Sequence, residues 1–140
     1  MARTATSSSA DTLEKVPLLE GLTKRDRQRL ARSMKSRTFP SGSQVVVEDR
    51  RGVGFFIIVD GKAAVTVGGQ VVEMLGPGDY FGEMALIQGD RRTATVTADS
   101  DLECLSLTSW EFKPFVAEHP SVAWALLQTL AQRLRDNADR

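Results

Sequence analysis

The sequence has few of the residues that build catalytic or metal centres. Cysteine and histidine occur once each, as Cys104 and His119. One cysteine cannot form an internal disulfide, and the two residues are too few for the usual zinc clusters. A histidine-dependent triad has no second candidate, and no two carboxylates are evidently placed as an acid–base pair. We therefore expect a protein that is not an enzyme, in which His119 begins a helix and Cys104 is a buried thiol.

Net charge and long apolar runs are also missing. Eighteen basic residues balance eighteen acidic ones, which argues against binding to the phosphate backbone of nucleic acid and against a polybasic membrane anchor. No apolar run approaches the ~20 residues of a membrane span, and the amino terminus has no apolar signal-peptide core. We expect a cytoplasmic protein that binds neither nucleic acid nor membrane.

The chain has the length of one domain. It contains 140 residues, of which 41% are hydrophobic, enough for one ordinary core. Residues 1–10 are small and polar, so a disordered tail is predicted there. The predicted domain occupies residues 11–140.

Short apolar segments separated by glycine turns follow Phe39. They predict strands, with a tight hairpin turn at Asp60-Gly61 between the second and the third. So many short strands at this spacing indicate a sandwich, jelly roll or barrel. The predicted strands are residues 44–47, 55–59, 62–67, 70–75, 93–98 and 102–107.

Helices are predicted at both ends of the strand region. A short helix is expected within residues 11–22, and Thr23-x-x-Asp26 is a capping pattern for the next one. Thr108-x-x-Glu111 repeats that pattern near the carboxyl end. Proline at the first position begins a last helix, whose leucines recur at three and four residues. For the stripe of leucines at 127, 130 and 134, we favour core packing over a dimer seam, and for Trp124 we favour core packing over a place near the base.

One stretch, FGEMALIQGDRRTATVTA at residues 81–98, carries the functional signal. Gly82 permits a tight bend, and the residues after it form about one helical turn. The unpaired N–H groups at such a turn attract anions. An arginine from the following strand can complete a phosphate site.

Glu83 stands beside the proposed anion, where its charge repels a phosphate. The conflict disappears if the carboxylate accepts hydrogen bonds from a hydroxyl of the same ligand, as in other nucleotide sites where a carboxylate binds ribose. The ligand indicated is a nucleotide with a free 2′-hydroxyl and a phosphate folded close to its sugar. A cyclic 3′,5′-monophosphate meets that description.

This segment closely resembles the phosphate-binding cassette of cyclic nucleotide-binding domains, the type found in catabolite activators and protein kinase A regulatory subunits. FGEMAL and RRTATV carry the resemblance, with Arg91 where the family usually has proline. In that family the arginine and the N–H groups after the glycine hold the phosphate, and the glutamate binds the ribose 2′-hydroxyl. The resemblance implies ligand-binding roles for Gly82, Glu83, Met84, Ala85, Arg92 and Thr93.

The resemblance extends over nearly the whole chain after Asp11. FFIIVDGKAAV is similar to the strand pair whose turn glycine, Gly61 here, is a family hallmark. VEDRRG departs from the pattern, because Asp49 and Arg50 stand where most members have a glycine and an acidic residue. The implied fold is mainly β: a β-roll or jelly roll with amino-terminal helices and carboxyl-terminal hinge and lid helices.

The implied function is a cAMP sensor that closes its carboxyl-terminal helices over the bound base. It needs no cofactor beyond this ligand. The alternatives are a cGMP-binding domain, for which Thr93 is the candidate contact, and the sensor fragment of a longer transcription regulator, channel or enzyme. A domain that kept the fold for protein contacts alone is disfavoured by the intact Glu83 and Arg92. Expected partners are an unknown effector and, through the carboxyl-terminal helix, a second copy.

Overall fold

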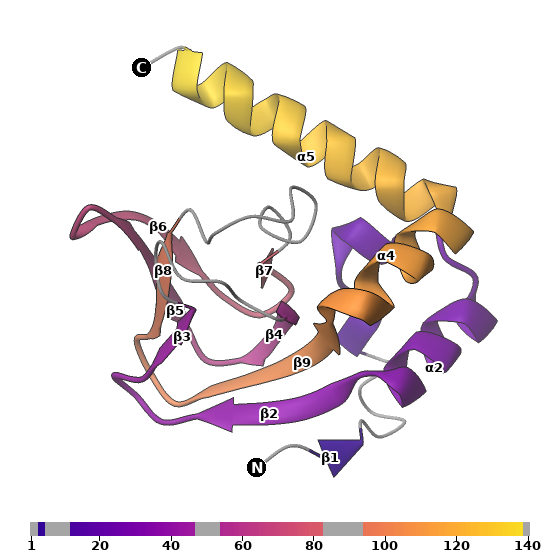
Figure 1. The fold of residues 1–140 in the computed structure, drawn as a ribbon, viewed down its shortest axis with the longest axis horizontal. Helices are drawn as coiled ribbons and strands as arrows, with labels where there is room; N and C mark the ends of the chain where they lie inside the picture. Colours follow the sequence, from indigo (N-terminus) through magenta and orange to yellow (C-terminus); the bar gives the residue numbers. More distant parts are fainter. Residues whose placement is uncertain (1–2, 5–11, 47–53, 83–93, 139–140) are drawn as a thin grey trace.

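Two antiparallel sheets stand at the centre of the fold, with helices on one side (Figure 1). The computed structural model describes residues 3–4, 12–46, 54–82 and 94–138. Its elements in chain order are β1 (Arg3–Thr4), η1 (Pro17–Leu19), α2 (Lys24–Ser33), β2 (Lys35–Phe39), β3 (Gln44–Val46), β4 (Gly54–Asp60), β5 (Ala63–Val67), β6 (Gln70–Leu75), β7 (Tyr80–Phe81), β8 (Thr95–Ala98), β9 (Leu102–Thr108), α4 (Ser109–Glu118) and α5 (Pro120–Ala138).

The strands divide into a five-stranded sheet, in the order β1-β2-β9-β4-β7, and a four-stranded sheet, in the order β3-β8-β5-β6. This arrangement confirms the predicted β-roll with flanking helices. The six predicted strands are present within a few residues of their expected ends, whereas β2 and β7 were not predicted. Of the predicted tail, Arg3 and Thr4 form β1 on β2; its other residues lie outside the described ones, and the tail and domain boundary stay predictions.

Strand β4 separates two hydrophobic cores because its residues alternate between the faces of the sheet. Phe55 and Ile57 pack against the helices. Phe56 and Ile58 point into the roll between the sheets. All four are at most 5% exposed, which confirms the predicted strand that is buried on both faces.

The predicted hairpin at Asp60-Gly61 is wrong. Consecutive strands β4 and β5 lie in different sheets, so the chain turns a corner between the sheets at Gly61. Gly61 has φ +92°, and a Cβ there would overlap the carbonyl oxygen of Asp101. Lys62 continues the corner, donating its N–H to Ser100 Oγ at 3.0 Å and accepting from the Asp99 N–H at 2.9 Å. The corner therefore interlocks with the turn between β8 and β9.

Both predicted capping patterns are present. The Asp26 N–H donates to Thr23 Oγ1 at 3.1 Å at the start of α2. At the start of α4, the N–H and the hydroxyl of Thr108 both donate to Glu111 Oε1, at 3.0 and 2.7 Å. Helix α4 continues through Pro114 and ends at Glu118, with His119 as its C-cap.

The capping box on α4 gives a stability prediction. Replacing Thr108 by alanine removes the hydroxyl bond and should lower the free energy of unfolding by about 1 kcal/mol near neutral pH. Hydrogen bonds from the Thr108 hydroxyl and N–H lower the pKa of Glu111 from 4.5. A carboxyl group whose pKa is lower in the folded state stabilises the fold at any pH above its pKa in the unfolded chain. That stabilisation is lost as the pH falls through the pKa of the folded state.

Urea unfolding of Thr108→Ala and the parent chain should therefore show a difference that shrinks below pH 4.5. Thr23→Ala is the matched control, because its cap accepts from a backbone N–H and involves no carboxylate. The Thr23→Ala substitution should lower the free energy of unfolding by a similar amount, about 1 kcal/mol. This loss should not shrink below pH 4.5, because no Glu111 bond is removed. A Thr108→Ala penalty that is unchanged in acid would contradict this interpretation.

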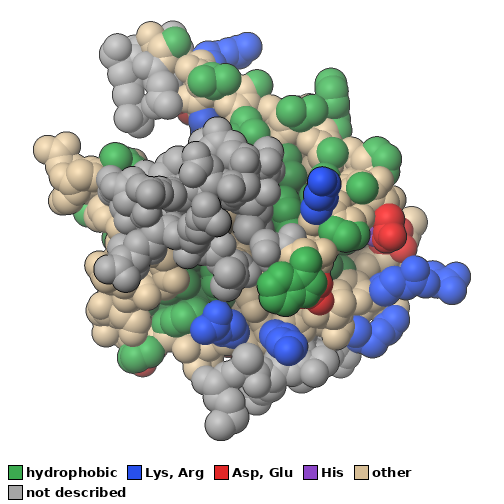
Figure 2. Space-filling model, viewed as in Figure 1, with side chains coloured by type: hydrophobic (Ala, Val, Ile, Leu, Met, Phe, Trp, Pro, Cys, Tyr) green, Lys and Arg blue, Asp and Glu red, His purple; other side chains and the backbone are tan. Residues whose placement is uncertain are grey.

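Helix α5 differs from its predicted packing. Val122 and Leu126 are buried, whereas Trp124, Leu127 and Leu134 are 64%, 57% and 71% exposed. The prediction of core packing is therefore wrong for Trp124, Leu127 and Leu134, whereas Leu130 is partly buried. Hydrophobic side chains lie along the exposed length of α5 in Figure 2. Within the described residues, no helix is long and apolar enough to span a membrane.

Candidate functional site

The candidate site begins where β7 ends. Phe81 pairs with Phe56 of β4, and their rings stack with centroids 5.0 Å apart and planes inclined by 16°. Gly82 follows at φ +97°, in the left-handed region that favours glycine. The structure thus supports the sequence interpretation of Gly82 as the residue that bends the chain into the cassette.

The site ends at β8, which lies between β3 and β5 in the other sheet. Val96 and Ala98 of β8 point into the roll and are at most 4% exposed. The segment between Gly82 and β8 therefore connects the edge of one sheet to the middle of the other. Of the predicted ligand-binding residues, Gly82 is described; the others lie outside the described residues and keep their roles as predictions: Glu83, Met84, Ala85, Arg92 and Thr93. Arg91, Asp49 and Arg50 also lie outside them.

Cys104 lies inside the roll, fully buried next to the apolar residues of both sheets. Burial raises the pKa of its thiol to about 12, with Arg37 opposing and Glu103 adding to the increase. A thiol that stays protonated is a poor nucleophile and a poor metal ligand. The structure confirms the expected buried thiol.

His119 lies at the junction of α4 and α5, as predicted for a residue at a helix start. Its Nδ1 is 3.9 Å from Asp26 Oδ2, and its ring packs on Phe115 at 4.9 Å. Among the described residues, no group of three histidine, cysteine or acidic side chains could hold a metal ion.

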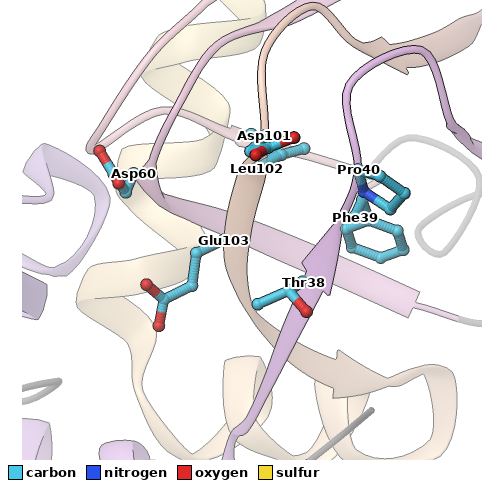
Figure 3. A pocket seen from close by; sticks show the side chains of 7 residues that line it. All are labelled: Thr38, Phe39, Pro40, Asp60, Asp101, Leu102 and Glu103. Carbon is cyan, nitrogen blue, oxygen red and sulfur yellow. The ribbon is translucent and has the colours of Figure 1, made fainter.

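A cavity of about 450 Å³ opens where β2, β4 and β9 reach the sheet corner (Figure 3). Three carboxylates line it, those of Asp60, Asp101 and Glu103, beside the ring of Phe39. The Ser41 N–H donates to Asp101 at 3.0 Å. Carboxylates repel a phosphate, so this cavity does not fit the anion that the cassette predicts.

The chain belongs to the cyclic nucleotide-binding domain family, whose sequence pattern matches residues 36–119. The matched residues include both sheets except β1 and Lys35, the whole predicted cassette, and α4. The family assignment, made first from the cassette, is confirmed.

Proteins of known type show the same relationship. A cyclic nucleotide-gated potassium channel of Rhizobium etli is 35% identical over 84% of this chain and 33% of its own length. The regulatory domain of Toxoplasma gondii PKA, crystallised with cAMP, is 28% identical, with a TM-score of 0.79 over 91% of this chain and 49% of its own. The catabolite activator protein of Thermus thermophilus is 30% identical, with a TM-score of 0.79 over 87% of this chain and 60% of its own. The chain thus spans about a third of the channel.

Sequence reasoning missed the contact between Phe56 and Phe81, the residue before Gly82. Phe56 was assigned only to a buried strand, although its ring contacts the residue before Gly82. Strand β7 was not predicted, so nothing in the sequence paired Phe56 with Phe81. The only available signal was a phenylalanine directly before the cassette glycine.

Proposed function

We propose that this domain binds cAMP and acts as a sensor. The observation that carries the proposal is the glycine bend after β7, at φ +97°, at the start of a segment with the family's order of glutamate and arginine. A domain of the same family with 28% identity was crystallised with cAMP. Binding rather than catalysis is the proposed role of the domain.

In the proposed complex, the cyclic phosphate accepts hydrogen bonds from N–H groups of the turn and from Arg92. The turn consists of Gly82 and the next residues, Glu83 to Ala85. Charge-assisted bonds of this kind are roughly twice as strong as neutral ones. Glu83 accepts from the ribose 2′-hydroxyl, and Thr93 lies beside the phosphate. Together these groups select a nucleotide in which the phosphate and the free 2′-hydroxyl lie on one sugar.

Ligand binding is proposed to shift a population of helix positions. Helices α4 and α5 meet at His119, and this junction is the proposed hinge. In the closed form, the exposed apolar side chains of α5, which include Trp124 and Leu127, would pack against the base of the ligand. The closed form presents a changed surface to an effector or, through α5, to a second copy of the chain.

The alternative ligand is cGMP, with Thr93 as the proposed contact to the guanine. The domain is also proposed to serve as the sensor of a longer protein, because the relatives include a channel of about three times the matched length. The cytoplasm remains the proposed compartment.

Thermal unfolding with cAMP, cGMP and 5′-AMP tests the ligand. Ligand at a hundred times its dissociation constant should stabilise the folded domain by about 2.7 kcal/mol, seen as a higher Tm. We expect cAMP to raise the Tm at lower concentration than cGMP, and 5′-AMP to have little effect, because its phosphate is not cyclised. A response to 5′-AMP equal to that of cAMP, or no response to cAMP at millimolar concentration, would refute the proposal.

A further inference from the structure

Three phenylalanine rings form a row inside the roll, from β2 to the start of the candidate site. Phe39 meets the Phe56 ring edge-on, with centroids 6.3 Å apart. Phe56 stacks on Phe81 at 5.0 Å. At the far end, the guanidinium of Arg37 lies 5.2 Å from the centre of the Phe39 ring. The row ends at the residue directly before Gly82.

The central ring has little freedom to move. Phe56 is 5% exposed, with Phe81 on its face and Phe39 at its edge. On a further side lies Gly54, where a Cβ would come within 2.9 Å of the Phe56 Cζ. A buried ring enclosed in this way keeps a single rotamer.

The backbone pairing of strand β7 with β4 is short. It has two residues, which pair with Phe56 and Ile57 of β4. Further bonds to β4 lie upstream, where the Ile58 N–H donates to the Asp79 carbonyl at 2.8 Å and the Gly78 N–H to the Ile58 carbonyl at 2.9 Å. Phe81 is the last residue of this strand and stands directly before Gly82.

We propose that Phe56 is a positioning residue for the nucleotide site: its ring fixes Phe81, and through Phe81 the amide of Gly82. The inference depends on the proposed function, since it assigns this amide to the phosphate end of the ligand. Binding sites lose affinity when their donors are held loosely, even if every donor is present. Loosening the stack therefore weakens phosphate binding without removing a group that touches the ligand.

The test compares Phe56→Leu with Leu30→Ala. Leu30 on α2 is 5% exposed and belongs to the other core, so its truncation gives a matched loss of buried side-chain carbons away from the carboxyl-terminal helices. Both variants should have a lower Tm. By calorimetry at a temperature where both are folded, Phe56→Leu should bind cAMP up to about tenfold more weakly, the upper end of the worth of one aromatic pair. Leu30→Ala should stay within about twofold of the parent chain.

Amide hydrogen exchange in the ligand-free protein is the second measurement. Exchange at Gly82 should be faster in Phe56→Leu and unchanged in Leu30→Ala. If Phe56→Leu does not fold, Phe56→Met keeps most of the buried volume while removing the ring, and takes its place in both measurements.

The outcomes separate this inference from the proposed function. Equal affinity losses in the two variants, with the parent chain binding cAMP, would overturn the role of Phe56 and leave the proposed function standing. A parent chain that binds no cyclic nucleotide would end the proposed function. In that case the exchange rate at Gly82 decides the positioning role, and an unchanged rate in Phe56→Leu refutes it.

Discussion

Replacing Arg92 by alanine should weaken cAMP binding about thirtyfold or more. Arg92 is the proposed partner of the single negative charge on the cyclic phosphate. Removing one member of a buried, hydrogen-bonded charge pair costs about 2–5 kcal/mol, and about 1.4 kcal/mol corresponds to a factor of ten. Calorimetric titration with cAMP measures the loss directly.

Arg91→Ala is the matched control, because the neighbouring arginine is expected to be solvated. It removes the same charge one residue away, and exposed charges contribute ~0–1 kcal/mol. Affinity should therefore change by less than about fivefold. If the two variants lose affinity equally, the effect is a general electrostatic one, and Arg92 is not the phosphate ligand. Unchanged thermal unfolding without ligand would show that both variants remain folded.

The sequence predicts the chemistry of the candidate site, and of its residues the structure describes Gly82. Glu83 and Arg92 were predicted as ligand residues because a phosphate next to a ribose hydroxyl calls for a cation and a carboxylate; both lie outside the described residues. The contact between Phe56 and Phe81 could not be predicted in the same way. The two residues are far apart in the sequence, and hydrophobic periodicity does not indicate which strands pair.

Strands were predicted where the pattern was apolar and missed where it was not. Strand β4 is apolar along most of its length because both of its faces are buried. Strand β2, KSRTF, has polar or charged residues at four of its five positions, since only Ser36 and part of Phe39 point away from solvent. Pairing with β9 along its whole length holds β2 in place, and no local pattern encodes that pairing.

Helix α5 shows a different kind of ambiguity. Its leucines recur at three and four residues, which predicts one apolar face. In the structure, Val122 and Leu126 face the core, while Leu127 and Leu134 lie on a second, exposed face. Periodicity reports that a helix is amphipathic, whereas burial depends on how much of its surface the rest of the domain covers. The helix itself was predictable, and its partner surface was not.

The second large mutational effect is expected on stability, at Gly61 in the corner between the two sheets. Gly61→Ala should lower the free energy of unfolding by about 3 kcal/mol or more, a large share of the ~5–15 kcal/mol typical of a domain. A left-handed backbone costs an alanine about 1–2 kcal/mol, and φ here is +92°. Overpacking adds about 1–3 kcal/mol, because the new methyl group would overlap the Asp101 carbonyl and lie 3.1 Å from the Leu102 Cα. Urea unfolding followed by circular dichroism measures the change.

Gly42→Ala separates the two causes. Gly42 has nearly the same φ, +91°, but a Cβ there would meet nothing within 4 Å. Its substitution should therefore cost only the backbone term, about 1–2 kcal/mol. The excess loss at Gly61 measures how tightly the corner packs on the turn between β8 and β9, where Lys62 bonds to Asp99 and Ser100. Equal losses at the two glycines would mean that this turn moves aside freely, and that the backbone conformation alone requires glycine at position 61.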